Sequence, residues 1–444
     1  MRKAYEEYKA TGIQWLPNIP KHWEILKLRQ ILSSFSEKNH PDMPLLSVVR
    51  EKGVIIRNTE NTDENHNYIP DDLTNYKLVK TGQFAMNKMK AWQGSYGVSD
   101  HDGIVSPAYF VFNFVLDIDK HFFNTAIRSK SYVNFFGQAS DGIRVGQWDL
   151  SMARMKYIPF YVPPRDEQEQ IVRFLDWKVS CINRLINILK EKKRLILELR
   201  QANINYAMYP QKDWTLAPLK QYALSNQAAL SSTTPEETII KYIDINTVGN
   251  GYLKNKPEIY TFKDAPLRAR RIIHSGDTIV STVRTYLRSV CFLNNYYEGC
   301  VASTGFSVLT PKIGVMPELL GFALTSDYFI SQVIKSSTGV SYPAISDNKL
   351  MRLQVAFPSE LYKQKLLVEK INKMNQKVVS LTNYITQQIT NLHDLKSSLI
   401  ADVVTGQIDV RDVEIPDYEQ VAESLYEAND NATLQSEDKI PEEV

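Results

Sequence analysis

The chain has 444 residues, of which 43% are hydrophobic and 23% are charged; this composition excludes a disordered or fibrous protein and suffices for two or three globular domains. The net charge of +2 is unevenly spread, because residues 410–444 hold 11 acidic and two basic residues, which leaves +11 on residues 1–409. A basic body favours an anionic partner such as nucleic acid, and a solvated surface that happens to be basic is the alternative.

Cysteine usage and hydropathy bear on the compartment. Cys181, Cys291 and Cys300 are scattered, with neither a disulfide framework nor the spacing of a zinc site. No segment offers the roughly 18 consecutive apolar residues that a membrane span needs, and the first residues show no targeting pattern. We therefore expect a cytoplasmic protein without a metal site.

Residues 1–164 predict the first of two globular modules. Short apolar runs such as GIVSPAYFVF (103–112) are typical of strands with intervening helices and indicate an α+β domain. Basic and aromatic residues interleave in NKMKAWQGSYG (87–97), and such side chains neutralise phosphates and read bases. A solvated surface charge is the alternative for each basic residue, and a place in the core for Trp92. The candidate DNA contacts of this module are Lys88, Lys90, Trp92, Tyr96, Arg128, Lys130 and Arg144.

Residues 165–209 predict a long helix. Pro163 and Pro164 precede it and favour extended backbone just before the first turn. Apolar residues recur at heptad positions a and d along its length, which indicates a coiled-coil seam. A helix lying on a single core is the alternative. The expected seam residues are Ile171, Leu175, Ile182, Leu185, Leu189, Ile196 and Leu199.

Residues 210–358 repeat the plan of the first module. Trp214 aligns with Trp23, and Tyr286 with Trp92, at offsets that drift between about 191 and 197 residues along the chain. The run SGDTIVSTVRTYLRS (275–289) supplies both a strand pattern and basic side chains; Tyr286 has the same core alternative as Trp92. The candidate DNA contacts of this module are Arg268, Arg270, Arg271, Arg284, Tyr286 and Arg288.

Residues 359–409 predict a second long helix. Its opening, PSELYKQKLLVEKIN (358–372), restates PPRDEQEQIVRFLD (163–176), with Gln364 in the place of Gln168. Its heptad pattern again indicates a seam. The expected seam residues are Leu367, Ile371, Met374, Val378, Leu381, Ile385, Leu392, Leu395 and Leu399.

The order module, helix, module, helix constrains the arrangement. The joint Met208–Asp213 is short, so helices that pair along their length must be antiparallel, and together they form a spacer of roughly 60 Å. Two similar modules separated by an antiparallel two-helix coiled coil have a pseudo-twofold axis, the symmetry with which proteins contact two half-sites on one duplex. The acidic residues 410–444 are poor in large apolar side chains, and we expect them to be disordered.

The sequence contains no catalytic motif that we can identify. It has no dinucleotide-binding glycine motif, phosphate-binding loop, zinc-protease motif, nucleophile elbow or amino-methyltransferase motif, and its seven histidines are dispersed. We therefore expect that this chain is not an enzyme.

Five stretches together resemble the specificity subunits of type I restriction-modification systems. The resemblance extends up to Arg411, but the second copy departs from the pattern in SELYKQ (359–364) and the central joint is short. These departures leave it open whether the two helix openings dock partners equivalently. The stretches are GIQWLPNIPKHWEILKL (12–28), NKMKAWQGSYGVSDHDGIVSPAYFVF (87–112), PPRDEQEQIVRFLD (163–176), SGDTIVSTVRTYLRS (275–289) and KSSLIADVVTGQIDVR (396–411).

The resemblance implies a non-catalytic, DNA-binding subunit of a restriction system. Each module would be a target recognition domain that reads one half of a split, asymmetric DNA sequence, and the helices would set the gap. Implied partners are double-stranded DNA, two modification (methyltransferase) subunits that use S-adenosylmethionine, and restriction (translocase and nuclease) subunits that use ATP and Mg²⁺. The chain itself would carry no cofactor. The alternatives are a coiled-coil interaction scaffold that does not read DNA, and an enzyme fused to a recognition module.

Overall fold

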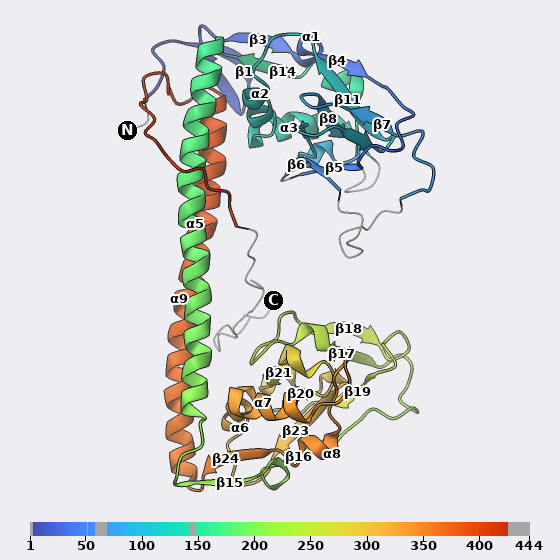
Figure 1. Ribbon diagram of the computed structural model, residues 1–444, viewed down its shortest axis with the longest axis vertical. Coiled ribbons are helices and arrows are strands. Elements are labelled where there is room, and N and C mark those ends of the chain that lie inside the picture. Colours follow the sequence, from blue (N-terminus) through green and yellow to red (C-terminus); the bar gives the residue numbers. More distant parts are fainter. Residues whose placement is uncertain (1–2, 51, 58–68, 143–147, 425–444) are drawn as a thin grey trace. The chain divides into compact units, whose positions relative to one another are not determined.

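The computed structural model shown in Figure 1 divides into two compact units. The first comprises Met1–Asn187 and Thr390–Ser424, and the second is built on Ile188–Ile389. Each unit contains one globular module and one part of each long helix, α5 (Arg165–Ala207) and α9 (Leu361–Val404). The structure describes residues 3–50, 52–57, 69–142 and 148–424.

The first module combines small antiparallel sheets with short helices, as its sequence predicts. The four residues of the strand Phe84–Asn87 are all buried, and the first three of them are apolar. The elements are β1 (Tyr8–Ile13), β2 (Leu16–Pro20), β3 (Glu24–Lys27), α1 (Leu28–Ile31), β4 (Leu32–Phe35), β5 (Leu46–Val49), β6 (Gly53–Ile56), β7 (Lys77–Val79), β8 (Phe84–Asn87), β9 (Tyr96–Val98), β10 (Gly103–Val105), β11 (Tyr109–Phe114), α2 (Lys120–Ile127), α3 (Lys130–Gln138), β12 (Ser140–Asp141), β13 (Asp149–Leu150), α4 (Met152–Met155) and β14 (Pro159–Val162).

The second module has the same types of element in the same order around its main sheet. Its central strand, Thr278–Ser281, is also buried throughout. The elements are β15 (Trp214–Pro218), β16 (Ala223–Ser225), β17 (Ile239–Ile243), β18 (Glu258–Thr261), β19 (Ala269–Ile272), β20 (Thr278–Ser281), β21 (Val290–Phe292), β22 (Val301–Ser303), β23 (Phe306–Pro311), α6 (Pro317–Thr325), α7 (Asp327–Ser336), α8 (Asp347–Leu350) and β24 (Gln354–Pro358).

The strand order confirms the internal repeat. The main sheet is β4-β11-β8-β9 in the first module and β16-β23-β20-β21 in the second, and both are antiparallel throughout. Even the register agrees, because Leu32 pairs with Phe114 and Ala223 pairs with Pro311. The second module has another sheet, β18-β17-β22-β19, which contains one parallel pair, β17 with β22. In the first module a parallel bridge from Leu45 to Ile104 stands at the corresponding place, between β5 and β10.

Each module packs a helix pair against its main sheet. In the first module Phe122 and Phe123 of α2 and Phe136 of α3 are fully buried in one core with Phe84 of β8. In the second, the helices α6 and α7 share a core with the strands β20 and β23. Burying whole aromatic rings is the largest apolar contribution available to a module of this size.

The two long helices contact each other in both units and run antiparallel (Figure 1). In the first unit Asn183 of α5 accepts a hydrogen bond from Lys396 of α9 at 2.8 Å, and the apolar residues of both helices enter one core. In the second unit Arg200 of α5 donates to Asn375 of α9 at 2.9 Å. Increasing residue numbers on α5 therefore meet decreasing numbers on α9, as an antiparallel pair requires. The alternative of a helix lying on a single core is not supported.

The buried faces of the long helices differ in part from the predicted seam. Leu185 and Leu199 are 51% and 63% exposed, whereas Ile186 is fully buried. An α-helix has 3.6 residues per turn and drifts by about 20° per heptad against a strict 3.5-residue repeat, so the buried face rotates away from the predicted positions. Leu381 and Leu395 are also half exposed. Of the other predicted residues, Ile171, Leu175, Ile182, Ile371, Val378 and Ile385 are buried, and Leu189, Ile196, Leu367, Met374, Leu392 and Leu399 are partly buried.

The repeated phrase that opens both helices is explained by one buried glutamine in each. The Gln168 side chain donates to the Pro163 carbonyl at 2.8 Å and accepts from the Asp119 amide at 2.9 Å. The Gln364 side chain donates to the Pro358 carbonyl at 2.9 Å and accepts from the Met316 amide at 2.9 Å. Asp119 and Met316 are the residues that cap the N-termini of α2 and α6. Each glutamine therefore fastens a long helix to its own module.

We expect Gln364→Met to destabilise the second unit by about 2–4 kcal/mol, because it leaves a buried amide and buried carbonyls without partners. The neighbouring exposed Lys365→Met is the matched control and should change the free energy of unfolding by less than about 0.5 kcal/mol. Urea unfolding of the two variants measures the difference. Equal stability of both variants would contradict the role given to Gln364.

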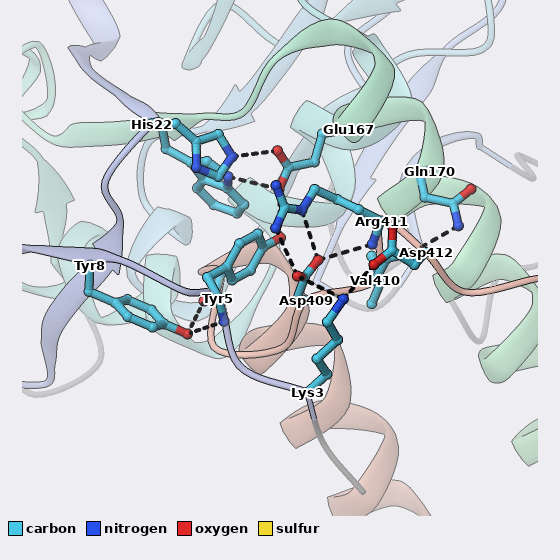
Figure 2. Close-up of polar contacts among 12 residues, drawn as sticks. Lys3, Tyr5, Tyr8, His22, Glu167, Gln170, Asp409, Val410, Arg411 and Asp412 are labelled. Atoms are coloured by element: carbon cyan, nitrogen blue, oxygen red, sulfur yellow. Dashed lines mark hydrogen bonds and ion pairs between the residues drawn. The ribbon is translucent and has the colours of Figure 1, made fainter.

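The start of the chain and the end of α9 meet in the first unit (Figure 2). Glu167 is buried and accepts hydrogen bonds from the Tyr5 hydroxyl at 2.6 Å and the Trp23 indole at 2.9 Å. Burial and the hydrogen bond to Glu167 raise the pKa of the Tyr5 hydroxyl. Arg411 pairs with buried Asp409 at 2.9 Å and stacks over the Tyr5 ring at 5.0 Å. Side chains from three separate parts of the sequence therefore close this end of the unit.

The acidic tail differs from its prediction. Residues 410–424 lie against α5 and are held by several hydrogen bonds, so the expected disorder does not apply to them. Residues 425–444 are outside the described residues.

Candidate nucleic-acid interface

The same hairpin appears in both modules and carries the sequence-predicted basic and aromatic residues. In the first, β8 and β9 are joined through a 3-10 helix at Ala91–Gln93, and in the second β20 and β21 are joined through one at Thr285–Leu287. Arg284 and Arg288 flank the second 3-10 helix in left-handed backbone, with φ of 48° and 54°. Non-glycine residues rarely adopt this conformation, and where they do a functional constraint is common.

The first hairpin carries the exposed Lys90 and the partly exposed Trp92, and Trp92 forms an aromatic pair with Trp148 from the segment before β13. The rings of Trp92 and Trp148 lie 4.9 Å apart, and the Trp92 indole donates to the Met89 carbonyl at 3.2 Å. Lys88 pairs with Asp149 at 3.2 Å, whereas Lys90 is exposed. A partly exposed tryptophan pair can stack on a base or pack along a groove.

The second hairpin presents arginine and tyrosine. The Arg284 guanidinium lies over the Tyr342 ring at 5.0 Å, and both side chains are exposed. Tyr286 is 53% exposed at the tip of the hairpin, so its alternative as a core residue is excluded. Tyr342 was not among the sequence candidates, because it comes from the separate loop between α7 and α8.

A basic pocket of about 460 Å³ adjoins this hairpin and was also missed from the sequence. Its cations are Lys335, Lys349 and Arg352, and none of them forms an ion pair with a carboxylate within the described residues. The pocket joins the hairpin through a hydrogen bond of 2.8 Å between Ser337 and Thr285. Unpaired cations that converge beside hydroxyl groups suit a phosphate.

Two first-module candidates lie inside the structure rather than on its surface. Tyr96 is 0% exposed in the module core, so its assignment as a DNA contact is wrong. Arg128 is half-buried, and burial lowers the pKa of its guanidinium. It donates to the Arg50 carbonyl at 3.2 Å and so supports a neighbouring loop.

The remaining candidates fall outside the two hairpins or are already paired. Arg288 donates to Asp327 at 2.6 Å. Lys130 is exposed at the first residue of α3, and Arg144 lies outside the described residues. In and beside β19, Arg268 pairs with Asp244 at 3.4 Å, Arg270 stacks over the Phe262 ring at 4.7 Å, and the Arg271 Nε atom is buried.

The described part of the chain has few groups that could bind a metal ion. Across residues 3–424, apart from the undescribed gaps, no three His, Cys, Asp or Glu side chains are grouped as metal ligands. No described helix is both long and apolar enough to cross a membrane. Burial raises the pKa of the Cys291 thiol to about 12, which makes it unreactive at neutral pH.

Comparison with known proteins gives a partial sequence match and a match in fold. No family model matches the chain. A stretch of 115 residues is 31% identical to the HindI specificity subunit of a type I restriction enzyme from Haemophilus influenzae. The chain resembles a type I specificity subunit. This match covers 25% of the chain, and it spans only a quarter of the length of that relative.

One solved structure shares the fold of this chain. A chain solved in work on complex assembly and conformational transition of the type I R-M system superposes with a TM-score of 0.60 at 15% identity, over 88% of this chain and 99% of that one. The HsdS subunit of Thermoanaerobacter tengcongensis covers 88% of this chain and 98% of its own at 15% identity, with a TM-score of 0.43. The first of these structures establishes the shared fold.

Proposed function

We propose that this chain is the sequence-specific DNA-binding subunit of a type I restriction-modification complex and that it has no catalytic activity of its own. It reads a bipartite DNA site, one half with each module. The observation that carries the proposal is the duplicated hairpin, because two copies of one fold present exposed basic and aromatic side chains at equivalent positions. Such side chains supply both phosphate contacts and base contacts.

The two half-sites differ in sequence. The first hairpin carries Lys90 and Trp92, which packs against Trp148 from the segment before β13, whereas the second carries Arg284 and Tyr286. Arginine presents a planar guanidinium with five donors, whereas lysine presents a single ammonium group, so the two hairpins offer different hydrogen-bond geometries to a base edge. One fold with two different sets of reading side chains recognises an asymmetric site.

The paired helices set the gap between the half-sites. Both are continuous, with 43 residues in α5 and 44 in α9, which corresponds to about 65 Å of helix. A spacer made of two mutually packed helices resists bending more than a loop of the same length, so it fixes one gap length.

Partner subunits dock on an exposed apolar stripe of α5. Ile188, Leu195 and Leu199 are each at least half exposed and follow one another at intervals of seven and four residues. Exposed apolar side chains at these intervals lie on one face of a helix, and such a face packs against a second helix. Two modification subunits and restriction subunits are the proposed partners; S-adenosylmethionine belongs to the former, and ATP with Mg²⁺ to the latter.

Base reading and phosphate contact can be separated within the second module. We expect Arg284→Ala to weaken DNA binding by about 1–3 kcal/mol and to relax one half-site only, if it contacts a base. Lys335→Ala, in the basic pocket, should instead weaken binding to every sequence and reduce the salt slope by about one. Titrations at several salt concentrations against variant half-sites measure both effects. A uniform loss for Arg284→Ala would assign it to a phosphate.

Methylome sequencing tests the proposed function as a whole. A host that expresses this chain with its modification subunit should carry a bipartite, adenine-methylated motif that disappears when the chain is deleted. An unchanged methylome would reject DNA reading and would favour a scaffold that binds only proteins.

A further inference from the structure

The segment that follows Arg411 is held against the long helices of the first unit, although it has neither helical nor strand structure. We call residues 412–424 the strap. In Figure 1 it is the red trace beside the first-unit part of α5. It begins at the closure of Figure 2, where Gln170 of α5 donates to the carbonyls of Val410 and Val413 at 3.0 and 2.8 Å.

Side chains of α5 bind the main chain of the strap. The Ser180 hydroxyl donates to the Glu419 carbonyl at 2.8 Å and accepts from the Val421 amide at 2.7 Å. Asn183 donates to the Val421 carbonyl at 2.9 Å. On the side of the strap these hydrogen bonds involve only backbone groups, so they would form with almost any residue at the strap positions.

One turn further along α5, Asn187 repeats the pattern. Its amide group donates to the Ala422 carbonyl at 3.0 Å and accepts from the Ser424 amide at 2.9 Å. Ser180, Asn183 and Asn187 are spaced by three and four residues, so they lie on one face of the helix. Together they form a row of donors and acceptors for an extended peptide.

Charge adds a preference for acidic residues. Glu423 of the strap lies 3.4 Å from both Lys396 and His393 of α9. Glu419 lies 3.4 Å from Arg184 of α5. The Lys396 ammonium also donates to the Asn183 side chain at 2.8 Å, which orients the asparagine towards the peptide.

The polar side chains of this helix face are buried while the strap lies against them. Ser180 and Asn183 are only 4% and 7% exposed with the strap in place. With an apolar occupant their polar groups would be buried without hydrogen-bond partners, which is unfavourable. The row of polar groups is therefore matched to a peptide backbone.

We propose that this face of α5 and α9 is a binding site for an extended acidic peptide and that the strap is its resident, exchangeable ligand. The strap is covalently tethered to α9 and is bound mainly through its backbone, so its occupancy depends on the high effective concentration of a tethered segment. The same segment, added as a separate molecule, binds once the tethered strap is released. This site is separate from the DNA-reading hairpins.

The test uses the full chain and a fluorescent synthetic peptide of residues 412–424. Val421→Pro removes the amide that donates to Ser180 and should release the strap; Val421→Ala keeps that amide and is the matched control. We expect fluorescence anisotropy to show at least tenfold tighter peptide binding to the Val421→Pro chain than to the natural chain or the Val421→Ala chain.

Specificity for the site is tested in the Val421→Pro chain. Adding Asn183→Leu should abolish peptide binding, whereas Asn203→Leu, an exposed position on the same helix, should leave it unchanged. A peptide methylated on the Val421 amide should not bind. Hydrogen exchange of the strap, measured in the same samples, should be faster after Val421→Pro. Unchanged exchange, the absence of peptide binding after release, or equal binding to all chains would each overturn the proposal.

Discussion

Replacing Leu195 and Leu199 together by glutamate should abolish assembly with the partner subunits and so remove DNA methylation by the complex. Both leucines are at least half exposed on α5, so the free chain loses little packing when they change. In a helical interface, by contrast, each would place an unpaired charge among apolar side chains, which costs several kcal/mol. Two such charges predict a loss of affinity of more than about 100-fold.

Lys192→Glu is the matched control for the leucine variant, because it also adds negative charge to an exposed position of the same helix. Co-purification of tagged chains with the modification subunit measures assembly, and urea unfolding measures stability. Retained assembly of the double glutamate variant would show that partners dock elsewhere. Equal loss in the Lys192→Glu chain would point to a general charge effect.

The repeated fold could be predicted because its signature occurs twice in the sequence. Alignments such as Trp23 with Trp214 and Gln168 with Gln364 correspond to equivalent places in the two units. The register of the main sheets agrees with the drifting offset. The role of the glutamines could not be read from the sequence, because their partners, the amides of Asp119 and Met316, are about 48 residues away.

The helix seam and the reading surface were predicted only in part. A heptad count placed Leu185 in the seam, but the drift of a regular helix puts Ile186 there instead. The runs of basic and aromatic residues singled out from the sequence lie in the two hairpins, although the hairpins themselves were not predicted. Tyr96 points inward from the adjacent strand β9, and no local pattern separates it from an exposed aromatic residue.

Residues assembled by tertiary structure were missed. The basic pocket draws Lys335 from α7 and Lys349 and Arg352 from the segment around α8. The strap was missed for a different reason: its acidic composition is typical of disorder, and its partners Ser180 and Asn183 look like ordinary polar residues of a helix surface.

Shortening both helices together is the most direct test of whether the paired helices set the gap between the half-sites. Residues 190–196 of α5 lie opposite residues 381–387 of α9, as the contacts Asn183–Lys396 and Arg200–Asn375 indicate. Deleting both heptads keeps the two faces in register, because seven residues are close to two full turns. The spacer becomes about 10 Å shorter, which is equivalent to about three base pairs along a duplex.

The decisive measurement is the methylated motif of a host that carries this doubly shortened chain. We expect both half-sites to keep their sequences and the gap between them to lose about three base pairs. An unchanged gap, or a new half-site sequence, would contradict the proposal that the paired helices set the gap between the half-sites.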